Sequence, residues 1–213
     1  MAHFLVIGAS KGIGLQTVKR GLALGHRIRG FARSAASMDI ADPSFAPFPG
    51  DATNPEDLKR ALDGIDAVIL TLGIKESVAM LWKEVTLFSD ATRALIPAME
   101  AAGVDRLVCL TGIGTGESVS AFSRIERLGH SVVLGKPYQD KTRQEEMIRA
   151  SSLRWTFARP VILTNGGFTG RYRVLTNPDE WRLGLISRAD VADFLIRAAE
   201  DDSLVGAAPV LTR

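Results

Sequence analysis

Three glycines near the N-terminus constrain the fold of this chain more than any other feature. Residues 3–14 read HFLVIGASKGIG, so Gly8, Gly12 and Gly14 lie between an apolar run and a stretch of helical periodicity. Gly8 permits a tight turn, Gly12 lets the backbone approach a ligand, and Gly14 lets a helix pack closely on a strand. The helix start then offers free amides and a positive dipole end to phosphates. Their position between strand and helix predicts a dinucleotide-binding turn, with a ligand-free glycine turn as the alternative.

The rest of the chain alternates short apolar runs with longer stretches of helical periodicity. We expect buried strands at 3–8, 26–32, 66–73, 105–112 and 153–160, and a late edge strand at 208–212. We expect helices near 12–24, 55–62, 86–102, 138–150 and 188–200. Strands separated by such helices predict right-handed crossovers and a parallel sheet covered on both faces. The predicted fold is α/β, a doubly wound Rossmann-type parallel sheet with helices on both faces, forming a single domain over residues 1–213.

Three stretches have little pattern: 34–50, 113–136 and 164–186. In an open α/β sheet, ligands bind beyond the carboxyl ends of the strands. We therefore expect loops on the substrate side at 113–136 and 164–186. The first of these contains His130, interpreted either as a general acid or as polar surface. It also carries three basic residues that suit an anionic substrate or form a solvated charged face, namely Arg124, Arg127 and Lys136.

Two local patterns predict where helices begin. Asn54 precedes Pro55 and an acidic first turn, which suits a helix N-cap followed by proline at the first helical position. Ser187, followed three residues later by Asp190, resembles a capping box at the start of the last helix. We interpret Asp190 as a capping residue in preference to a catalytic acid.

Composition and charge exclude several classes of function. A hydrophobic content of 46% and a charged content of 23% are typical of a globular protein, and a formal net charge of +2 argues against nucleic acid or an anionic membrane as a partner. No apolar run approaches the ~20 residues that span a bilayer, and we expect no signal peptide. The single cysteine, Cys109, is expected to be a buried, inert thiol in a cytoplasmic protein. The three histidines are too far apart to predict a metal site.

The end of the second expected strand indicates which dinucleotide binds. An NAD site usually has an acidic side chain there, which accepts hydrogen bonds from the ribose hydroxyls. This chain has no acid between Arg27 and Met38, so a 2′-phosphate would meet no repulsion. Arg33 is placed to pair with that phosphate, and Lys11 in the glycine turn adds a second positive charge. We therefore expect NADP(H) in preference to NAD(H), with two solvated surface cations as the alternative.

Together these features resemble the short-chain dehydrogenase/reductase superfamily over about residues 3–200. The chain is most similar to small atypical members: the biliverdin-IXβ/flavin reductase type, NmrA-like proteins and truncated relatives of sugar epimerases. The motifs that carry the resemblance are GASKGIG (8–14), GDATNPEDLKRAL (50–62), LTLG (70–73), LVCLTGIG (107–114), KTRQEEMIRASSLRWTFARPVILTNG (141–166) and ISRADVADFLIRAAED (186–201).

The resemblance implies specific contacts with a bound cofactor. Asp51 would contact the adenine, and the LTLG segment would lie beside the adenosine ribose. Lys141 would hydrogen-bond the nicotinamide ribose, and the backbone of Val161 and Ile162 would meet the carboxamide. The full set of expected cofactor-binding residues is Gly8, Ala9, Ser10, Lys11, Gly12, Ile13, Gly14, Arg33, Ser34, Asp51, Ala52, Leu72, Gly73, Lys141, Pro160, Val161 and Ile162.

The catalytic positions depart from the pattern of conventional superfamily members. Those members carry a Ser at the end of the fifth strand, a Tyr as proton donor and a Lys four residues after the Tyr. Alignment on Lys141 places Pro137 at the tyrosine position, one residue before Tyr138, and only the Thr111 hydroxyl is available at the serine position. Positions three apart on a helix are still neighbours, turned by about 100° from positions four apart. The catalytic candidates are therefore Lys141, Thr111 and Tyr138, although Tyr138 is also interpreted as an amphipathic aromatic at a helix start.

The leading hypothesis is an NADPH-dependent oxidoreductase of the atypical short-chain type. It would transfer hydride to a small conjugated acceptor such as a flavin, a quinone or a carbonyl compound, because such acceptors do not require a dedicated tyrosine. Trp82 and Trp181 are each interpreted as a pocket wall for a flat substrate or as core packing. The alternative function is a non-catalytic NADP(H)-binding redox sensor. Neither hypothesis requires nucleic acid or a membrane, and a homodimer remains open.

Overall fold

The computed structural model describes residues 1–74, 85–121 and 124–213, with side chains described outside 119–135. The helices are α1 (Gly12–Ala23), α2 (Pro55–Ala61), α3 (Leu87–Ala102), α4 (Arg124–Arg149) and α5 (Arg188–Glu200). The strands are β1 (His3–Ile7), β2 (Arg27–Ala32), β3 (Phe45–Pro49), β4 (Ala67–Leu70), β5 (Arg106–Leu110), β6 (Arg154–Pro160), β7 (Ile162–Thr164), β8 (Arg173–Leu175), β9 (Leu185–Ser187) and β10 (Val210–Thr212). No helix in the described ranges is long and apolar enough to cross a membrane.

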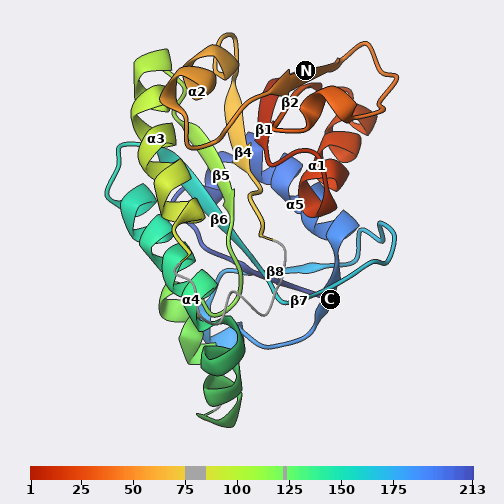
Figure 1. Ribbon diagram of the computed structural model, residues 1–213. Helices are drawn as coiled ribbons and strands as arrows, with labels where there is room; N and C mark the ends of the chain where they lie inside the picture. The colour runs from red at the N-terminus through yellow and green to blue at the C-terminus, as the bar shows by residue number, and fades with distance from the viewer. Residues whose placement is uncertain (75–84, 122–123) are drawn as a thin grey trace.

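The described strands form one large sheet and one small one (Figure 1). The large sheet has the order β3-β2-β1-β4-β5-β6-β10-β8, and every neighbouring pair is parallel except β10 with β8. The first six strands follow the order of a doubly wound Rossmann sheet, in which ligands bind where the strand order reverses. That reversal lies between β1 and β4. The small sheet pairs β7 with β9 in parallel.

The large sheet separates two apolar cores. Along β1, Phe4 and Val6 face the core shared with α1 and α5, whereas Leu5 and Ile7 face the core shared with α2, α3 and α4. Helix α1 packs against α5 on one face, and α3 packs between α2 and α4 on the other (Figure 1). Because side chains alternate along a strand, a strand buried on both faces must be apolar throughout. This requirement explains the unbroken apolar runs in the sequence.

The expected fold class is confirmed, but two expectations about strands are wrong. The strand at 208–212 is not an edge strand, because β8 pairs antiparallel with the outer side of β10. The unpatterned stretch 34–50 contains β3, which forms the opposite edge of the sheet. Its sequence, FAPFP, carries two prolines, which only an edge strand tolerates easily because they cannot donate to a ladder. The same prolines concealed this strand in the sequence.

The helix expected at 138–150 is longer than predicted. Helix α4 begins at Arg124, so much of the loop expected at 113–136 is helical, and Pro137 lies inside the helix instead of at its start. Proline more often opens a helix, because inside one it removes a backbone hydrogen bond and costs ~3 kcal/mol. The interior proline therefore misled the prediction of the helix start.

Helix α3 begins with a cap supplied by another helix. Its own N-cap residue, Thr86, makes no side-chain capping bond within the described structure. Instead the buried Asp140 of α4 accepts hydrogen bonds from the N–H groups of Phe88 (2.9 Å) and Ser89 (3.3 Å). One turn later, Gln144 donates to the Thr92 hydroxyl at 2.8 Å. These bonds fix α4 against the start of α3.

Both predicted helix caps are confirmed. The Asn54 side chain accepts from the Glu56 N–H at 3.0 Å, and the Ser187 hydroxyl accepts from the Asp190 N–H at 3.0 Å. The Asp190 carboxylate also accepts from the backbone N–H groups of Thr169 (2.8 Å) and Gly170 (3.0 Å). Burial acts to raise the pKa of Asp190, but these hydrogen bonds hold it below its ordinary value. Asp190 therefore anchors the loop before β8 to the start of α5.

Candidate active site

The glycine turn joins β1 to α1 at the carboxyl end of the sheet. Gly8 has a φ of +88°, and the N–H groups of Gly8 and Ala9 donate to the Phe31 carbonyl of β2 at 2.9 and 3.2 Å. A Cβ atom on Gly8 would lie 2.8 Å from the Thr71 carbonyl oxygen, beyond β4. A Cβ atom on Gly14 would lie 2.2 Å from the Gly8 carbonyl oxygen. Both positions therefore require glycine, as the sequence predicts.

Gly12 differs, because a Cβ atom there would meet no described atom within 4 Å. It opens α1, whose N-cap residue, Lys11, makes no side-chain capping bond and whose first turn contains no acid in the described structure. The amides at the helix start are thus left for a ligand, and the helix dipole favours an anion there. Ser10 and Ile13 complete the turn, Ser10 partly exposed and Ile13 buried. This arrangement fits the diphosphate of a dinucleotide.

The expected 2′-phosphate contacts lie just beyond β2. Arg33 and Ser34 directly follow this strand and are exposed. The Asp51 carboxylate accepts from the N–H (2.9 Å) and the hydroxyl (2.8 Å) of Thr53. These hydrogen bonds lower the pKa of Asp51, with a smaller contribution from the nearby charge of Arg33. The remaining expected residues of this end, Ala52, Leu72 and Gly73, are partly or fully exposed.

Two catalytic candidates converge on the end of β5. The Lys141 ammonium donates to the backbone carbonyls of Leu110 (3.3 Å) and Thr111 (2.9 Å) and lies 4.8 Å from the centre of the Phe88 ring. A Cβ atom on Gly112 would lie 3.0 Å from the Tyr138 hydroxyl oxygen, so the Tyr138 hydroxyl rests against the backbone beside Thr111. Helix α4 thus brings both side chains to the strand end where the resemblance places the reactive group.

Burial gives Lys141 an unusual acidity. Desolvation lowers the pKa of Lys141 to about 8, while Cys109 and Glu145 act in the opposite direction. Cys109 is fully buried, and burial raises the pKa of its thiol to about 12. The expectation of a buried cysteine is confirmed, and the thiol is unreactive at neutral pH.

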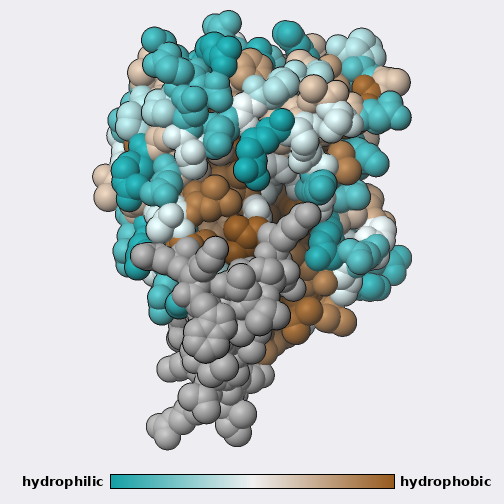
Figure 2. Space-filling view, viewed as in Figure 1, coloured by the Kyte–Doolittle hydropathy of each residue, from teal (hydrophilic) through white to brown (hydrophobic). Residues whose placement is uncertain are grey.

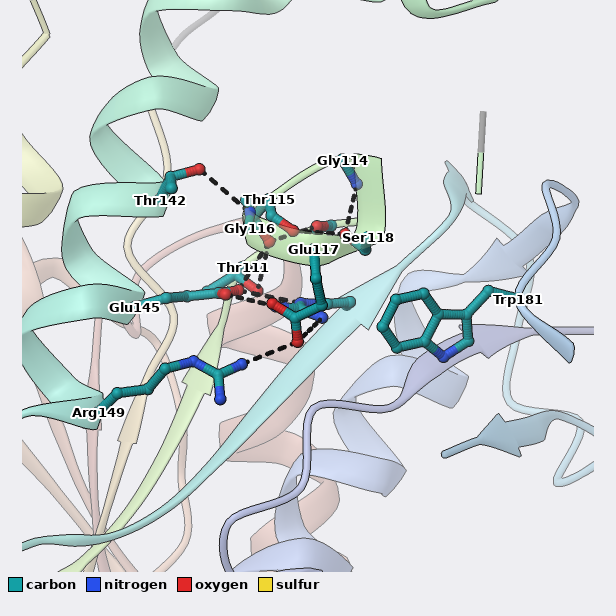
Figure 3. A network of polar contacts seen from close by, with 12 residues as sticks. Thr111, Gly114, Thr115, Gly116, Glu117, Ser118, Thr142, Glu145, Arg149 and Trp181 are labelled. Carbon is teal, nitrogen blue, oxygen red and sulfur yellow. Dashed lines mark hydrogen bonds and ion pairs between the residues drawn. The ribbon is translucent and has the colours of Figure 1, made fainter. Parts of the chain in front are cut away.

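The Thr111 side chain points into a buried polar network (Figure 3). Thr111 is 5% exposed, and its hydroxyl oxygen lies 3.5 Å from that of Thr115. The Thr115 hydroxyl donates to the Glu145 carboxylate at 2.7 Å. Of the three catalytic candidates, Thr111 is therefore the one whose side chain faces away from the surface.

Arg159 of β6 lies at the centre of this network, a role that was not predicted from the sequence. Its fully buried guanidinium pairs with Glu145 at 2.5 Å and with Glu117 at 3.1 Å, and Arg149 also reaches Glu117 at 3.0 Å. Burial acts to lower the pKa of Arg159, but the two carboxylates raise it overall. The one signal in the sequence was a charged residue within an otherwise buried strand.

The Arg159 guanidinium carbon lies 5.6 Å from the centre of the Trp181 ring, and Figure 3 shows the indole beside the polar network. The indole N–H donates to the Leu175 carbonyl at 3.0 Å. Trp181 also lines an open cleft of about 670 Å³ with Arg173 and Arg182. Trp181 therefore packs against the core and also lines this cleft. Trp82 lies outside the described residues, as do the side chains of Arg124, Arg127 and His130.

Some backbone groups at the end of β6 and just after it are already hydrogen-bonded within the protein. The Pro160 carbonyl accepts from the Ile113 N–H at 3.1 Å, and the Val161 N–H donates to the Leu211 carbonyl at 3.1 Å, so that N–H is not free for a ligand. Ile162 begins β7 and is 60% exposed, and its neighbour Leu185 in β9 is 55% exposed. Figure 2 shows apolar surface gathered in the hollow at the centre of this face and along its lower side.

A cleft that was not predicted from the sequence lies between the first turns of α1 and α5. Arg188, at the start of α5, and Asn165, after β7, line it together with Gly12. No short-range pattern could reveal this cleft, because its walls are far apart in the sequence. Within the described side chains, no group of three or more His, Cys, Asp or Glu residues is arranged to hold a metal ion.

Comparison with known proteins identifies a family and several relatives. A family model described as NAD(P)H-binding matches residues 8–202. The 3-beta-hydroxysteroid dehydrogenase of Mycolicibacterium neoaurum is 32% identical over 115 residues, which are 51% of this chain and 31% of that protein. An uncharacterized sugar epimerase of Bacillus subtilis (strain 168), YhfK, is 28% identical over 148 residues, which are 70% of this chain and 63% of that protein. The matches thus span less than two thirds of either curated relative.

Solved structures resemble the whole chain. ChuY, an anaerobillin reductase from Escherichia coli O157:H7, has a TM-score of 0.78 and 25% identity, with 99% of this chain and 96% of that chain covered. A wide-type short-chain dehydrogenase/reductase from Veillonella parvula DSM 2008, in complex with NADP, has a TM-score of 0.80 and 17% identity, with coverage of 100% and 94%. The second likeness concerns the fold alone. The resemblance inferred from the sequence is confirmed.

Proposed function

Because this chain belongs to the NAD(P)H-binding family, we propose that it is an NADPH-dependent reductase that transfers hydride to a small conjugated acceptor. The observation that carries the proposal is the convergence of Lys141 and Tyr138 on the end of β5, at the same edge of the sheet as the glycine turn. The likeness to an anaerobillin reductase supports a conjugated acceptor. Flavins, quinones, carbonyl compounds and anaerobillin are the acceptors to test.

The residues of this chain hold and orient the cofactor. Reduced nicotinamide, when bound, supplies the hydride. The uncapped start of α1 at Gly12 would bind the diphosphate, and Arg33 would pair with the 2′-phosphate that distinguishes NADPH. Two of the three N–H donors of Lys141 are taken by strand carbonyls, which leaves one donor for the nicotinamide ribose. The hydrogen bonds to β5 fix the direction of that third donor.

Among the described residues, no tyrosine stands at the conventional position to donate the proton that must accompany the hydride. Pro137 stands at the usual tyrosine position, and the Tyr138 hydroxyl rests against Gly112. An acceptor that spreads the added negative charge over a conjugated system takes its proton from water without a positioned side chain. We therefore place hydride delivery and cofactor orientation in the protein, and protonation in the solvent.

The test is a turnover assay of the purified protein with NADPH and the acceptor panel, followed at the absorbance band of reduced nicotinamide. We expect oxidation of NADPH with at least one acceptor. Turnover should survive the substitution Tyr138→Phe and should be lost in Lys141→Ala. Tight NADPH binding without turnover of any acceptor would favour the sensor function. Loss of turnover in Tyr138→Phe would indicate that Tyr138 is the proton donor.

A further inference from the structure

A cleft of about 360 Å³ lies where the first turns of two helices approach each other. Its described lining residues come from α1, from the segment after β7 and from α5: Gly12, Leu15, Gln16, Asn165, Gly166, Arg188 and Ala189. No acidic residue is among them. The cleft therefore combines an open helix start with one cationic side chain.

The two helices contribute different groups to this cleft. Helix α1 contributes backbone amides, because the described structure shows no side-chain cap on its first turn. Helix α5 is capped by Ser187, and the acidic residue of its first turn, Asp190, is 1% exposed and bound to the 169–170 backbone, so it is not part of the lining. What α5 contributes is Arg188, which lines the same cleft as Gly12.

The guanidinium of Arg188 is held in place with donors to spare. It donates to the Asn165 side-chain oxygen at 2.6 Å, and among the described residues no carboxylate pairs with it. A guanidinium has five N–H donors in a planar fork that matches two phosphate oxygens. Asn165 is uncharged, so its contact orients the cation without neutralising it. The uncompensated donors and charge of Arg188 are therefore available to an anion that enters the cleft.

We infer that Arg188 binds the diphosphate of the cofactor and completes, from α5, the anion site that the glycine turn opens on α1. The inference rests on the proposed binding of NADP(H), and it adds a phosphate-binding side chain from near the C-terminal end of the chain. Because the diphosphate is common to NADPH and NADH, Arg188 contributes equally to the affinity for both. In this respect it differs from Arg33, whose proposed partner is present only in NADPH.

The test compares the dissociation constants of NADPH and NADH, measured by titrating the fluorescence of the reduced nicotinamide. Arg188→Ala should weaken the binding of both nucleotides by a similar factor, on the order of ten- to a hundredfold, because a charge-assisted hydrogen bond is lost. Arg188→Lys should recover part of the affinity, since it keeps the charge and loses the fork. Affinity for adenosine, which carries no phosphate, should be unchanged in both variants.

Asn165→Ala is the matched control, because it removes the side chain that accepts from Arg188 in the described structure and keeps the charge. If Arg188 binds phosphate directly, Asn165→Ala should weaken the nucleotides far less than Arg188→Ala does. Equal losses in the two variants would overturn the inference, since Arg188 would then act only by holding the loop. Unchanged affinities in a folded Arg188→Ala variant would also overturn it. Failure of the unaltered protein to bind either nucleotide would instead refute the proposed function.

Discussion

The two halves of the candidate site are built from different materials. Around the glycine turn, the structure depends on backbone contacts: Gly8 and Gly14 touch neighbouring carbonyl groups so closely that no side chain fits. Around the end of β5, it depends on charged side chains: the buried Arg159 of β6 pairs with the buried Glu145 of α4 and with Glu117. A backbone site is fixed by local sequence, whereas a side-chain site is fixed by tertiary packing. The two halves should therefore fail in different ways when altered.

The largest expected effect is in the side-chain half. Arg159→Ala removes a fully buried cation and leaves the Glu145 carboxylate, 2% exposed, without its main partner. We expect a loss of about 3–5 kcal/mol in the free energy of unfolding, because an unpaired buried charge is costly. Chemical denaturation measures it. The double variant Arg159→Met, Glu145→Leu should lose much less, since it removes both charges, and a loss in Arg159→Ala below about 1 kcal/mol would show that the network does not stabilise the fold.

The next effect contrasts two positions of the glycine turn. Gly14→Ala places a Cβ atom 2.2 Å from a backbone oxygen that cannot move easily, so we expect a loss of stability of about 1–3 kcal/mol. Gly12→Ala meets no described atom but keeps a φ of +56°, which costs an L-residue ~1 kcal/mol. In thermal unfolding without cofactor, the Gly14→Ala variant should thus have a lower melting temperature than the Gly12→Ala variant. The reverse ranking would contradict the close contact between α1 and the turn.

A smaller effect separates the two nucleotides. Arg33→Ala should weaken NADPH binding by about tenfold or more and leave NADH binding unchanged, because only NADPH carries the 2′-phosphate. Arg27→Ala is a suitable control, since Arg27 is also an exposed cation but begins β2, at the opposite end of the strand from Arg33. Equal NADPH affinity in Arg33→Ala and the unaltered protein would remove the basis for NADP(H) preference.

The smallest effect concerns pH. Lys141 has a pKa of about 8 in the folded protein and about 10.4 when unfolded, so the unfolded chain binds more protons between these values. This residue therefore makes stability rise with pH from about 8 to 10.4, and Lys141→Met should abolish that contribution to the slope. If turnover requires the ammonium form, kcat should fall above about pH 8. A kcat that stays constant up to pH 10 would show that turnover does not depend on the positive charge of Lys141.

The same contrast explains what the sequence could predict. The strands of the sheet, the glycine turn and the caps at Asn54 and Ser187 follow from periodicity and from residues within a few positions of each other. The length of α4 was mispredicted because Pro137 gives the local signal of a helix start, while packing against α3 keeps the helix intact. The Arg159 network and the Arg188 cleft depend on residues brought together only by the finished fold, so no local pattern could reveal them.

The capping of α3 by Asp140 has a consequence for the order of folding. Helix α3 receives the hydrogen-bond acceptor for Phe88 and Ser89 from a residue far later in the chain, so its first turn is complete only after α4 has docked. The amide protons of Phe88 and Ser89 should therefore exchange with solvent whenever α4 detaches, not when α3 alone frays. Asp140 also directly precedes Lys141. The event that completes the start of α3 is thus the same event that delivers the lysine to β5.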